Sequence, residues 1–289
     1  MRRLFPVTDQ TARPGRPGGP DETADREWGF DELADAYAYP ALAAGVEGGV
    51  EAGTAAGGGA VEGAAAGAPG HWLRANMVST LDGAAQHDGR SQPISSDTDM
   101  RIFGTLRALA DVVVVGAETV RLEGYRPARA REAFADRRAA AGQGPAPVIA
   151  VITASLDLDF SLPLFTSPLV PTLVLTGAGA ATDRVAAARG AGAEVLFAGD
   201  GAAVDPARAV AALAERGLRR QLTEGGPRML GQFIAAGVLD ELCLTVSPTL
   251  TAGDAQRIAG GPGIAVPARL ALASVLEEAG FLFTRYRRI

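Results

Sequence analysis

From residue 72 onward, short apolar runs alternate with stretches in which apolar residues recur every third or fourth position. The run Asp111–Gly116 contains four consecutive valines, as expected for a parallel strand that is covered on both faces. Pro206–Arg216 and Arg228–Ala236, in contrast, have the spacing of amphipathic helices. The alternation predicts strands at 72–78, 111–116, 148–153, 172–176, 194–197, 218–223 and 239–247, and helices after Ser95 or Ser96 and at 183–189, 206–216 and 228–236.

The last two predicted strands, Leu270–Leu276 and Gly280–Tyr286, have no helix between them, and Gly280 fits the turn of an antiparallel hairpin. Repeated strand–helix units that end in antiparallel strands predict an α/β fold with a mixed, mainly parallel sheet and helices on both faces. No later helix covers this hairpin or the apolar strand at Leu239–Pro248. Because uncovered sheet edges are usually paired or buried, we expect a homodimer.

The first 70 residues differ in composition from the rest of the chain. Residues 41–70 are nearly all Ala, Gly, Val and Glu and contain no aromatic residue. Such a tract has too little bulky apolar surface to offset the entropy lost on ordering. We therefore predict a largely flexible extension over residues 1–70 and one folded domain over 71–289. Within the extension, the aromatic-rich stretch Trp28–Pro40 is expected to form a short helix that packs on the domain.

Composition restricts the class of protein. The chain of 289 residues has a net charge of −6 and contains no lysine, which argues against nucleic-acid binding and excludes a P-loop. One cysteine, Cys243, and two histidines supply no cysteine-based zinc site, so no metal is expected. The chain has neither an apolar run long enough to span a membrane nor the apolar core of a signal peptide, so we expect a cytoplasmic protein with a small-molecule substrate.

The junction Glu224-Gly-Gly-Pro227 connects a predicted strand to a predicted helix. Two glycines allow a sharp turn and close approach to the backbone, and Pro227 suits the first position of a helix. The free N–H groups and the dipole at such a terminus favour a phosphate or diphosphate. Similar turns occur in α/β folds without a ligand. Whether this turn is a phosphate site or a simple connection therefore depends on the residues at the other strand ends.

Three further polar segments follow predicted parallel strands: Ser79–Gly83, Gly116–Glu123 and Thr153–Ser155. Ligands of open α/β sheets bind outside the carboxyl ends of the strands, so these segments and Glu224–Pro227 are expected to line one crevice. No G-x-G-x-x-G follows the first strand, so the ordinary dinucleotide fingerprint is absent.

Six segments in this order carry a resemblance to a known family: Ser79-Thr-Leu-Asp-Gly83, the Ser91 loop, Leu106-Arg-Ala108, Val115-Gly-Ala-Glu-Thr-Val120, Glu224-Gly-Gly-Pro227 and Val238-Leu-Asp-Glu-Leu242. Together they resemble the reductase domain of the bacterial bifunctional riboflavin-pathway deaminase-reductases. The form Arg121-Leu-Glu-Gly-Tyr125 makes the chain most similar to the stand-alone actinobacterial pyrimidine-reductase-like branch. The resemblance covers residues 72–286 and implies a dihydrofolate-reductase-like fold, NADPH as cofactor and a dimer.

The deaminase half of that family is not expected in this chain. A zinc nucleobase deaminase needs an H-x-E motif and a P-C-x-x-C motif. A single cysteine cannot supply these ligands, so we expect a reductase only.

The resemblance assigns roles position by position. For NADPH it implies contacts from the Val78 backbone, Thr119, Glu123 and the segment Gly225, Gly226, Pro227, Arg228, Met229 and Leu230, which would hold the diphosphate. For the substrate it implies Asn76, Ser91, Arg107, Pro127 and Glu224, with Arg107 as a partner for a phosphate. Four positions depart from the family pattern: Asn76 replaces a common lysine, Glu123 a common aspartate and Pro93 a common tryptophan, and Thr80 is inserted into the Ser-Leu-Asp-Gly signature.

Proton delivery and binding of the NADPH 2′-phosphate each require further residues. A proton must be delivered during reduction, and Glu224, Asp82 or a water that they hold are the candidates. The 2′-phosphate of NADPH needs donors at strand ends, for which Thr153, Ser155 and Thr176 are placed. Simpler roles remain open, because Asp82 also suits a turn before Gly83 and Arg107 also suits a helix C-terminus.

The expected reaction is hydride transfer from NADPH to a pyrimidine ribosylamine phosphate, of the 5-amino-6-(5-phosphoribosylamino)uracil reductase type. Two alternatives remain at this point. One is reduction of dihydrofolate or another pteridine, and the other is a protein that binds NADPH without catalysis.

Overall fold

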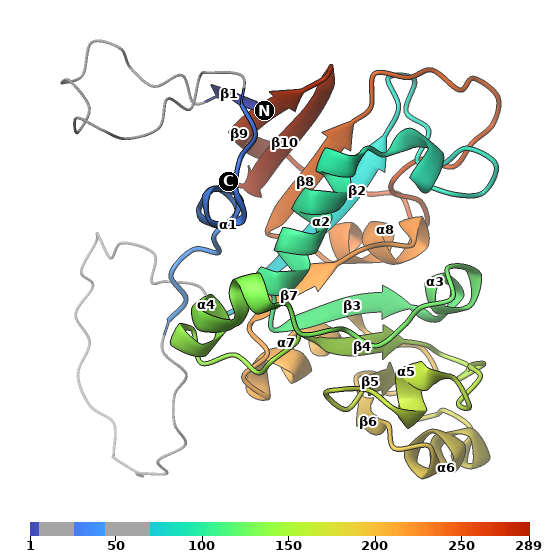
Figure 1. Cartoon of the computed structure of the whole chain (residues 1–289). Helices are drawn as coiled ribbons and strands as arrows, with labels where there is room; N and C mark the ends of the chain where they lie inside the picture. Colours follow the sequence, from blue (N-terminus) through green and yellow to red (C-terminus); the bar gives the residue numbers. More distant parts are fainter. Residues whose placement is uncertain (6–25, 44–69) are drawn as a thin grey trace, which may run out of the picture.

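Ten strands form one sheet within the part of the chain that the computed structural model describes, residues 1–5, 26–43 and 70–289 (Figure 1). The strands are β1 (Arg2–Phe5), β2 (Trp72–Ser79), β3 (Val112–Gly116), β4 (Val148–Ile152), β5 (Leu173–Thr176), β6 (Glu194–Phe197), β7 (Arg220–Thr223), β8 (Glu241–Val246), β9 (Leu270–Glu278) and β10 (Phe281–Arg288). The helices are α1 (Phe30–Ala36), α2 (Asp97–Leu109), α3 (Ala117–Leu122), α4 (Ala135–Ala140), α5 (Pro163–Thr166), α6 (Thr182–Gly190), α7 (Pro206–Glu215) and α8 (Pro227–Ala235), with 3₁₀ helices η1 (Gln92–Ile94) and η2 (Glu132–Phe134).

The strands lie in the order β1-β9-β10-β8-β2-β7-β3-β4-β5-β6. Neighbours from β8 to β6 are parallel, whereas β1, β9 and β10 pair antiparallel with their neighbours. The expected mixed, mainly parallel sheet with helices on both faces and antiparallel C-terminal strands is confirmed. Because β2, β7, β3 and β4 are adjacent and parallel, their carboxyl ends share one edge of the sheet.

Two apolar layers cover the sheet, one on each face. Along β3, Val113 and Val115 belong to the layer that includes residues of α1, α2 and α6, whereas Val112 and Val114 belong to the layer that includes residues of α7 and α8. Successive side chains of a strand point to opposite faces, so an unbroken valine run requires a cover on both sides. None of the described helices is long and apolar enough to cross a membrane.

Short helices are the main difference from the predicted elements. Ala117–Leu122, within the polar segment Gly116–Glu123, forms α3 and buries Val120. The stretch 128–144 contains η2 and α4. Segments of 3 to 6 residues contain too few positions for helical periodicity to be recognised.

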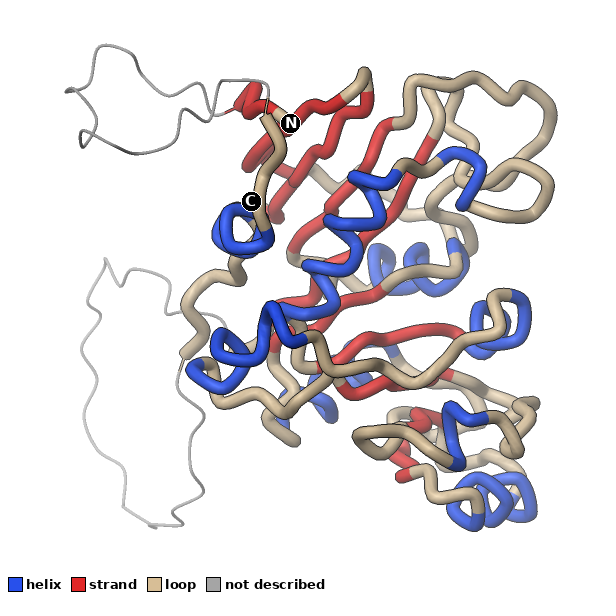
Figure 2. The backbone as a smooth tube through the Cα atoms, viewed as in Figure 1, coloured by secondary structure: helices blue, strands red, loops and turns tan. Residues whose placement is uncertain are grey.

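Parts of the predicted N-terminal extension pack against the domain. β1 pairs antiparallel with β9, and α1 buries Leu33 and Ala34. The short helix expected within Trp28–Pro40 is therefore confirmed. Both ends of the chain lie near the same end of the sheet (Figure 2). The flexible tract expected at 41–70 falls almost entirely outside the described residues, and the domain division at residue 70 stays a prediction.

A buried carboxylate, that of Glu241 on β8, is surrounded by cations from the neighbouring strands. Arg74 Nε on β2 lies 3.0 Å from Glu241 Oε1, and Arg285 Nε on β10 lies 2.9 Å from the same oxygen. Arg287 Nε and the indole N–H of Trp72 approach Oε2 at 3.3 and 3.0 Å. Burial disfavours the carboxylate charge, but Arg74 and Arg285 outweigh this effect and lower the pKa of Glu241 to about 2.

We predict that Glu241→Gln destabilises the fold by roughly 3–5 kcal/mol, because it leaves buried guanidinium groups without a counter-ion. The native pKa of about 2 is below the ordinary value of 4.5, so this carboxylate stabilises the fold above pH 4.5. Its contribution is lost as the pH falls from 4.5 towards 2. Urea unfolding of the wild type and the variant over this pH range measures both effects.

The control is Glu194→Gln, which removes an exposed pair with Arg216 (Oε1 to Nη2, 2.5 Å). Exposed pairs contribute little, so the control should stay close to the wild type. An equal loss in both variants would contradict the assignment, as would an acid dependence that Glu241→Gln leaves unchanged.

Candidate active site

A cavity of about 580 Å³ extends from the carboxyl ends of β3 and β7, beside Thr119 and Glu224, to Pro147 before β4. Glu224, which follows β7, forms part of its wall, and α2 contributes Phe103 and Arg107. The remaining wall comes from α3, from the segment between α3 and η2, and from Ser91, Arg138, Pro145 and Pro147. The predicted residues that line this cavity are Ser91, Arg107, Thr119, Glu123, Pro127 and Glu224. The structure thus brings together residues that are up to 133 positions apart, from Ser91 to Glu224.

Three polar side chains form a closed hydrogen-bonded group in this cavity. Arg107 holds the Glu224 carboxylate with both arms, Nε to Oε1 and Nη2 to Oε2, each at 2.5 Å. The Tyr125 hydroxyl donates to Glu224 Oε2 at 2.5 Å and accepts from Arg107 Nη2 at 2.5 Å. The guanidinium carbon of Arg107 also lies 4.5 Å from the ring centre of Phe103. The carboxylate is therefore fixed in place by a two-armed ion pair and one phenol.

Burial and charge keep Tyr125 and Arg107 in defined protonation states. Burial raises the pKa of Tyr125, and the neighbouring Glu224 carboxylate raises it further, so the phenol keeps its proton and can donate it in a hydrogen bond. For Arg107, burial lowers the pKa, but the Glu224 carboxylate outweighs this effect and raises the pKa above its ordinary range. Glu224 itself has only 4% of its side chain exposed.

Tyr125 is the member of this group that sequence reasoning missed. It stands in the segment Arg121–Tyr125, which was used only for the resemblance, and no role was assigned to it. Its partners are 18 and 99 positions away in the chain. The only local signal is its place two residues after Glu123, in a segment that follows a parallel strand.

Three arginines on the cavity wall have no partner of their own. Arg126, Arg129 and Arg131 line the cavity, and within the described chain none of their side chains forms a hydrogen bond or an ion pair. Arg138 also lines the cavity, but it donates to the carbonyl oxygens of Ala108, Ala110 and Gly144 at 2.7–2.8 Å. Uncommitted guanidinium groups are suited to a phosphate. They are better placed for that role than Arg107, because Glu224 already occupies two of the nitrogens of Arg107.

The Gly225–Gly226 turn lies beside this cavity, at the start of α8. The backbone N–H of Gly226 donates to Thr119 Oγ1 at 3.1 Å, and the peptide bond between the two glycines is cis. A Cβ added at Gly226 would lie 3.3 Å from Thr119 Oγ1, so a larger residue would crowd the turn. The Thr119 side chain therefore braces the turn. Because neither glycine has a side chain, a ligand can approach the backbone of the turn closely, as a diphosphate site requires.

Other predicted residues lie away from the cavity wall. Asn76 and Val78 are on β2, next to β7 and β8. The Asp82 carboxylate accepts hydrogen bonds from the Thr80 hydroxyl and from the backbone N–H groups of Thr251 and Ala252, the latter two at 3.1 and 2.6 Å. These hydrogen bonds lower the pKa of Asp82. Its contacts match the simpler interpretation, in which Asp82 holds a turn and the loop beside it.

The residues predicted for the 2′-phosphate differ in accessibility. Ser155 is exposed, and its Oγ accepts from the backbone N–H of Asp157 at 3.3 Å. Thr153 is buried, and its Oγ1 accepts from the backbone N–H of Leu156 at 3.0 Å. Thr176 is fully buried, so its hydroxyl does not face solvent. Of the three, only Ser155 presents its side chain at the surface.

Fold and cavity together define an α/β protein with a glycine-rich strand-to-helix turn and an arginine-lined cavity that reaches the carboxyl ends of β3 and β7. Residues 71–279 match the family described as the RibD C-terminal domain, and the chain belongs to this family. The resemblance noted in the sequence is thereby confirmed.

Relatives and solved structures agree with this membership. The 2,5-diamino-6-ribosylamino-4(3H)-pyrimidinone 5′-phosphate reductase of Aquifex aeolicus is 30% identical over 159 residues, which are 55% of this chain and 66% of that protein. The protein of the same name from Archaeoglobus fulgidus is 25% identical over 219 residues, 75% of this chain and 99% of the relative.

Among solved structures, a pyrimidine reductase-like protein of Corynebacterium diphtheriae is 29% identical, with a TM-score of 0.67 over 76% of this chain and 92% of that one. A deaminase/reductase of Thermotoga maritima has a TM-score of 0.58 at 18% identity, over 76% of this chain and 57% of that one, which shows the fold alone.

Proposed function

We propose that this protein is an NADPH-dependent reductase of a pyrimidine ribosylamine phosphate, of the 5-amino-6-(5-phosphoribosylamino)uracil reductase type in the riboflavin pathway. One observation carries the proposal: the fixed Glu224 carboxylate directly precedes a turn suited to a diphosphate and lines the same cavity as three arginines whose side chains have no partner in the described chain. Membership of the RibD C-terminal domain family and the names of the relatives support it.

The two ends of such a substrate differ in chemistry, and the cavity offers a group suited to each. A phosphate dianion is suited to Arg126, Arg129 and Arg131, which are charged and unpaired within the described chain. An aminopyrimidine carries N–H donors, and the Glu224 carboxylate is an acceptor whose position Arg107 and Tyr125 hold. The distribution of charge thus favours a ligand with a donor-rich ring at one end and a phosphate at the other.

The residues present also fit the cofactor. The helix dipole of α8 and the close-approach surface of Gly225 and Gly226 would hold the diphosphate, with Thr119 bracing the turn. When bound, NADPH supplies the hydride, and the protein supplies placement and exclusion of water. Of the two carboxylates considered for proton delivery, Glu224 lines the cavity and Asp82 does not. Because Glu224 accepts hydrogen bonds from Arg107 and Tyr125 as a carboxylate, we assign proton delivery to a water that Glu224 holds.

A turnover assay tests the proposed function. The purified protein should oxidise NADPH in the presence of the ribosylaminopyrimidine phosphate, and Glu224→Gln should lower kcat/KM by about two orders of magnitude. Glu194→Gln is a matched control, because Glu194 begins β6, is exposed and does not line the cavity.

Each alternative gives a different result in the same assay. Turnover of dihydrofolate without turnover of the pyrimidine would replace the proposed substrate. Tight NADPH binding without turnover of either compound would mean a protein that binds the cofactor without catalysis. An unimpaired Glu224→Gln variant would remove Glu224 from the chemistry.

Cofactor choice gives a second prediction. Gly226→Val should weaken NADPH and NADH alike, because its side chain would crowd Thr119 and block the shared diphosphate site. Ser155→Ala should weaken NADPH alone, by about 1–2 kcal/mol, if Ser155 donates to the 2′-phosphate. Fluorescence titration of both cofactors measures these effects. Equal losses for the two cofactors in Ser155→Ala would show that the 2′-phosphate lies elsewhere.

We also propose that the protein forms a homodimer through the sheet face that bears Leu242, Leu244 and Val246. These alternate residues of β8 stay partly exposed, whereas the residues between them are buried. Light scattering at micromolar concentration should give twice the chain mass, and Leu244→Glu should give a monomer because a charge cannot be buried there. Leu169→Glu, in an exposed loop before β5, is the control. A monomer mass for the wild type would end this proposal.

A further inference from the structure

The described part of the N-terminal segment, residues 26–43, lies outside the part of the chain that the family model matches. It is nevertheless built into the core. Trp28, Leu33 and Tyr37 are at most 1% exposed. They share one apolar cluster with Leu106 of α2, the helix that carries Arg107, and with Phe134 of η2. The segment therefore packs behind α2, which contributes to the cavity, and behind η2, which directly follows the cavity residue Arg131.

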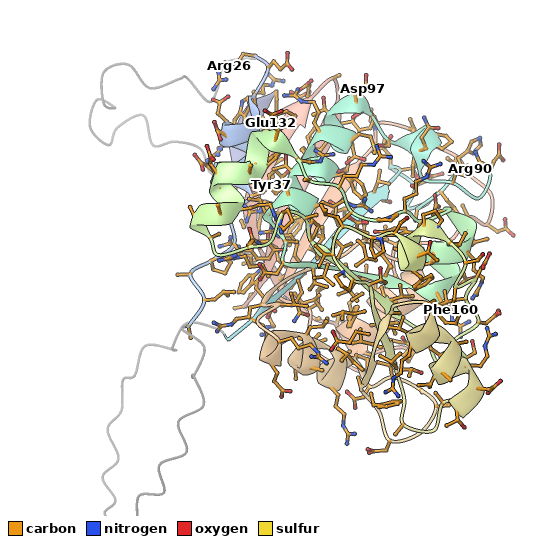
Figure 3. The ribbon with its side chains drawn as sticks, turned by 60° about the horizontal axis from the view of Figure 1, so that its bottom comes forward. Arg26, Tyr37, Arg90, Asp97, Glu132 and Phe160 are labelled. Carbon is orange, nitrogen blue, oxygen red and sulfur yellow. The ribbon has the colours of Figure 1, made fainter. Side chains whose placement is uncertain are left out.

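Helix α1 contacts η2 and α4 directly. The rings of Phe30 and Phe134 meet edge to face, with their centres 5.5 Å apart. Arg137 Nη2 of α4 lies 2.9 Å from Asp35 Oδ1 and 3.6 Å from Asp31 Oδ1. Tyr37, directly after α1, and Glu132 of η2 lie on the same side of the molecule in Figure 3. Apolar and ionic contacts thus join α1 to the outer side of the cavity wall that η2 and α4 form.

The inner side of the same wall faces the cavity. Arg131, directly before η2, and Arg138 of α4 both line it. Arg138 donates to the carbonyl oxygens of Ala108 and Ala110 at the C-terminal end of α2, each at 2.8 Å. A Cβ at Gly104 of α2 would overlap the guanidinium of Arg131, so only glycine leaves room for Arg131 at this point. The wall is therefore held between α2 on one side and α1 on the other.

The sheet in turn fixes the position of α1. Arg285 and Arg74, the cations paired with Glu241, donate to the carbonyl oxygens of Ala36 and Tyr37 at the end of α1, the second bond at 2.8 Å. Cations at a helix C-terminus also complement the helix dipole. Because these arginines are buried, α1 has a rigid point of attachment.

From these contacts we infer that residues 26–43 are a positioning element of the substrate cavity: α1 sets the place of η2 and α4 and thereby of the arginines that hold the substrate phosphate. The inference rests on the proposed function for the identity of the ligand. Without α1, η2 and α4 would lose the apolar cover of Phe134 and the partners of Arg137. The arginines would then have to be ordered when the ligand binds, and this cost appears as weaker binding.

The test uses the full chain with the double variant Phe30→Ala, Asp35→Asn. The KM for the phosphorylated pyrimidine should rise about three- to tenfold, while kcat and the KM for NADPH should stay close to the wild type. Binding of ribose 5-phosphate, measured by calorimetry, should weaken by a similar factor. Amide hydrogen exchange in residues 128–141 should become faster. Phe30→Leu, Asp35→Glu should restore the wild-type values, since it keeps an apolar side chain and a carboxylate.

Two further variants test whether these changes result from the loss of the α1 contacts. Asp200→Asn removes an exposed ion pair with Arg208 (Oδ1 to Nη1, 2.6 Å) away from the cavity and should change none of these quantities. Gly104→Ala should displace Arg131 from the α2 side, so it should raise the KM for the phosphorylated pyrimidine without faster exchange in α4.

Failure of the inference and failure of the proposed function give different results. If the wild type binds ribose 5-phosphate but turns over no pyrimidine, the proposed reaction is wrong, and the ribose 5-phosphate affinity of the double variant still tests the positioning. If the wild type does not bind ribose 5-phosphate, hydrogen exchange decides: faster exchange in residues 128–141 of the double variant supports the positioning. Exchange equal to that of the wild type overturns the inference, as does an unchanged KM for the phosphorylated pyrimidine in an active double variant.

Discussion

The ion pair between Glu224 and Arg107 is the interaction on which the site depends. It joins the end of a central strand to the helix that crosses one face of the sheet, and it is largely withdrawn from water. Burying two charges is favourable only when geometry is good and the remaining polar atoms are satisfied. Both conditions are met, because the pair is two-armed and Tyr125 supplies the further hydrogen bond. The Glu224 carboxylate is therefore held in one orientation, directly before the Gly225–Gly226 turn.

A second buried carboxylate has a different task. Glu241 lies between Arg74 and Arg285, and the same arginines reach the last carbonyl oxygens of α1. One network of charges therefore joins the antiparallel strands, the first parallel strand and the N-terminal segment. The two carboxylates therefore have different roles. Glu224 orients groups inside the cavity, and the arginines around Glu241 fix α1, which supports the cavity from outside.

Much of the fold could be predicted from local patterns, since a run such as Val112–Val115 or the glycine pair before Pro227 has few structural interpretations. The membership of the cavity was also largely predictable, because parallel strands bring their carboxyl ends to one edge. What could not be predicted are pairings between distant positions. Tyr125 meets Glu224 across 99 positions and Arg107 meets it across 117, and no local spacing encodes either contact.

The solvent accessibility of the candidate site residues could not be predicted from the sequence either. The hydroxyl of Thr176 and the carboxylate of Asp82 follow strands in the same way as the residues of the cavity, yet Thr176 is buried and Asp82 is bonded to a neighbouring loop. The arginines before α4 carry no local signal of a function, because free guanidinium groups indicate a binding site only when the fold places them on one cavity wall. Such properties depend on which surfaces the tertiary structure leaves open.

The central claim is that this cavity brings a reduced nicotinamide and a pyrimidine ribosylamine phosphate together for hydride transfer. The most direct measurement follows deuterium from NADPH that is labelled at the transferring position of the nicotinamide C4. After incubation with the protein and the substrate, mass spectrometry and NMR should find one deuterium per product molecule, on the former ribosyl C1 carbon. A product without deuterium, or labelled NADPH that stays unconsumed beside intact substrate, would contradict the account.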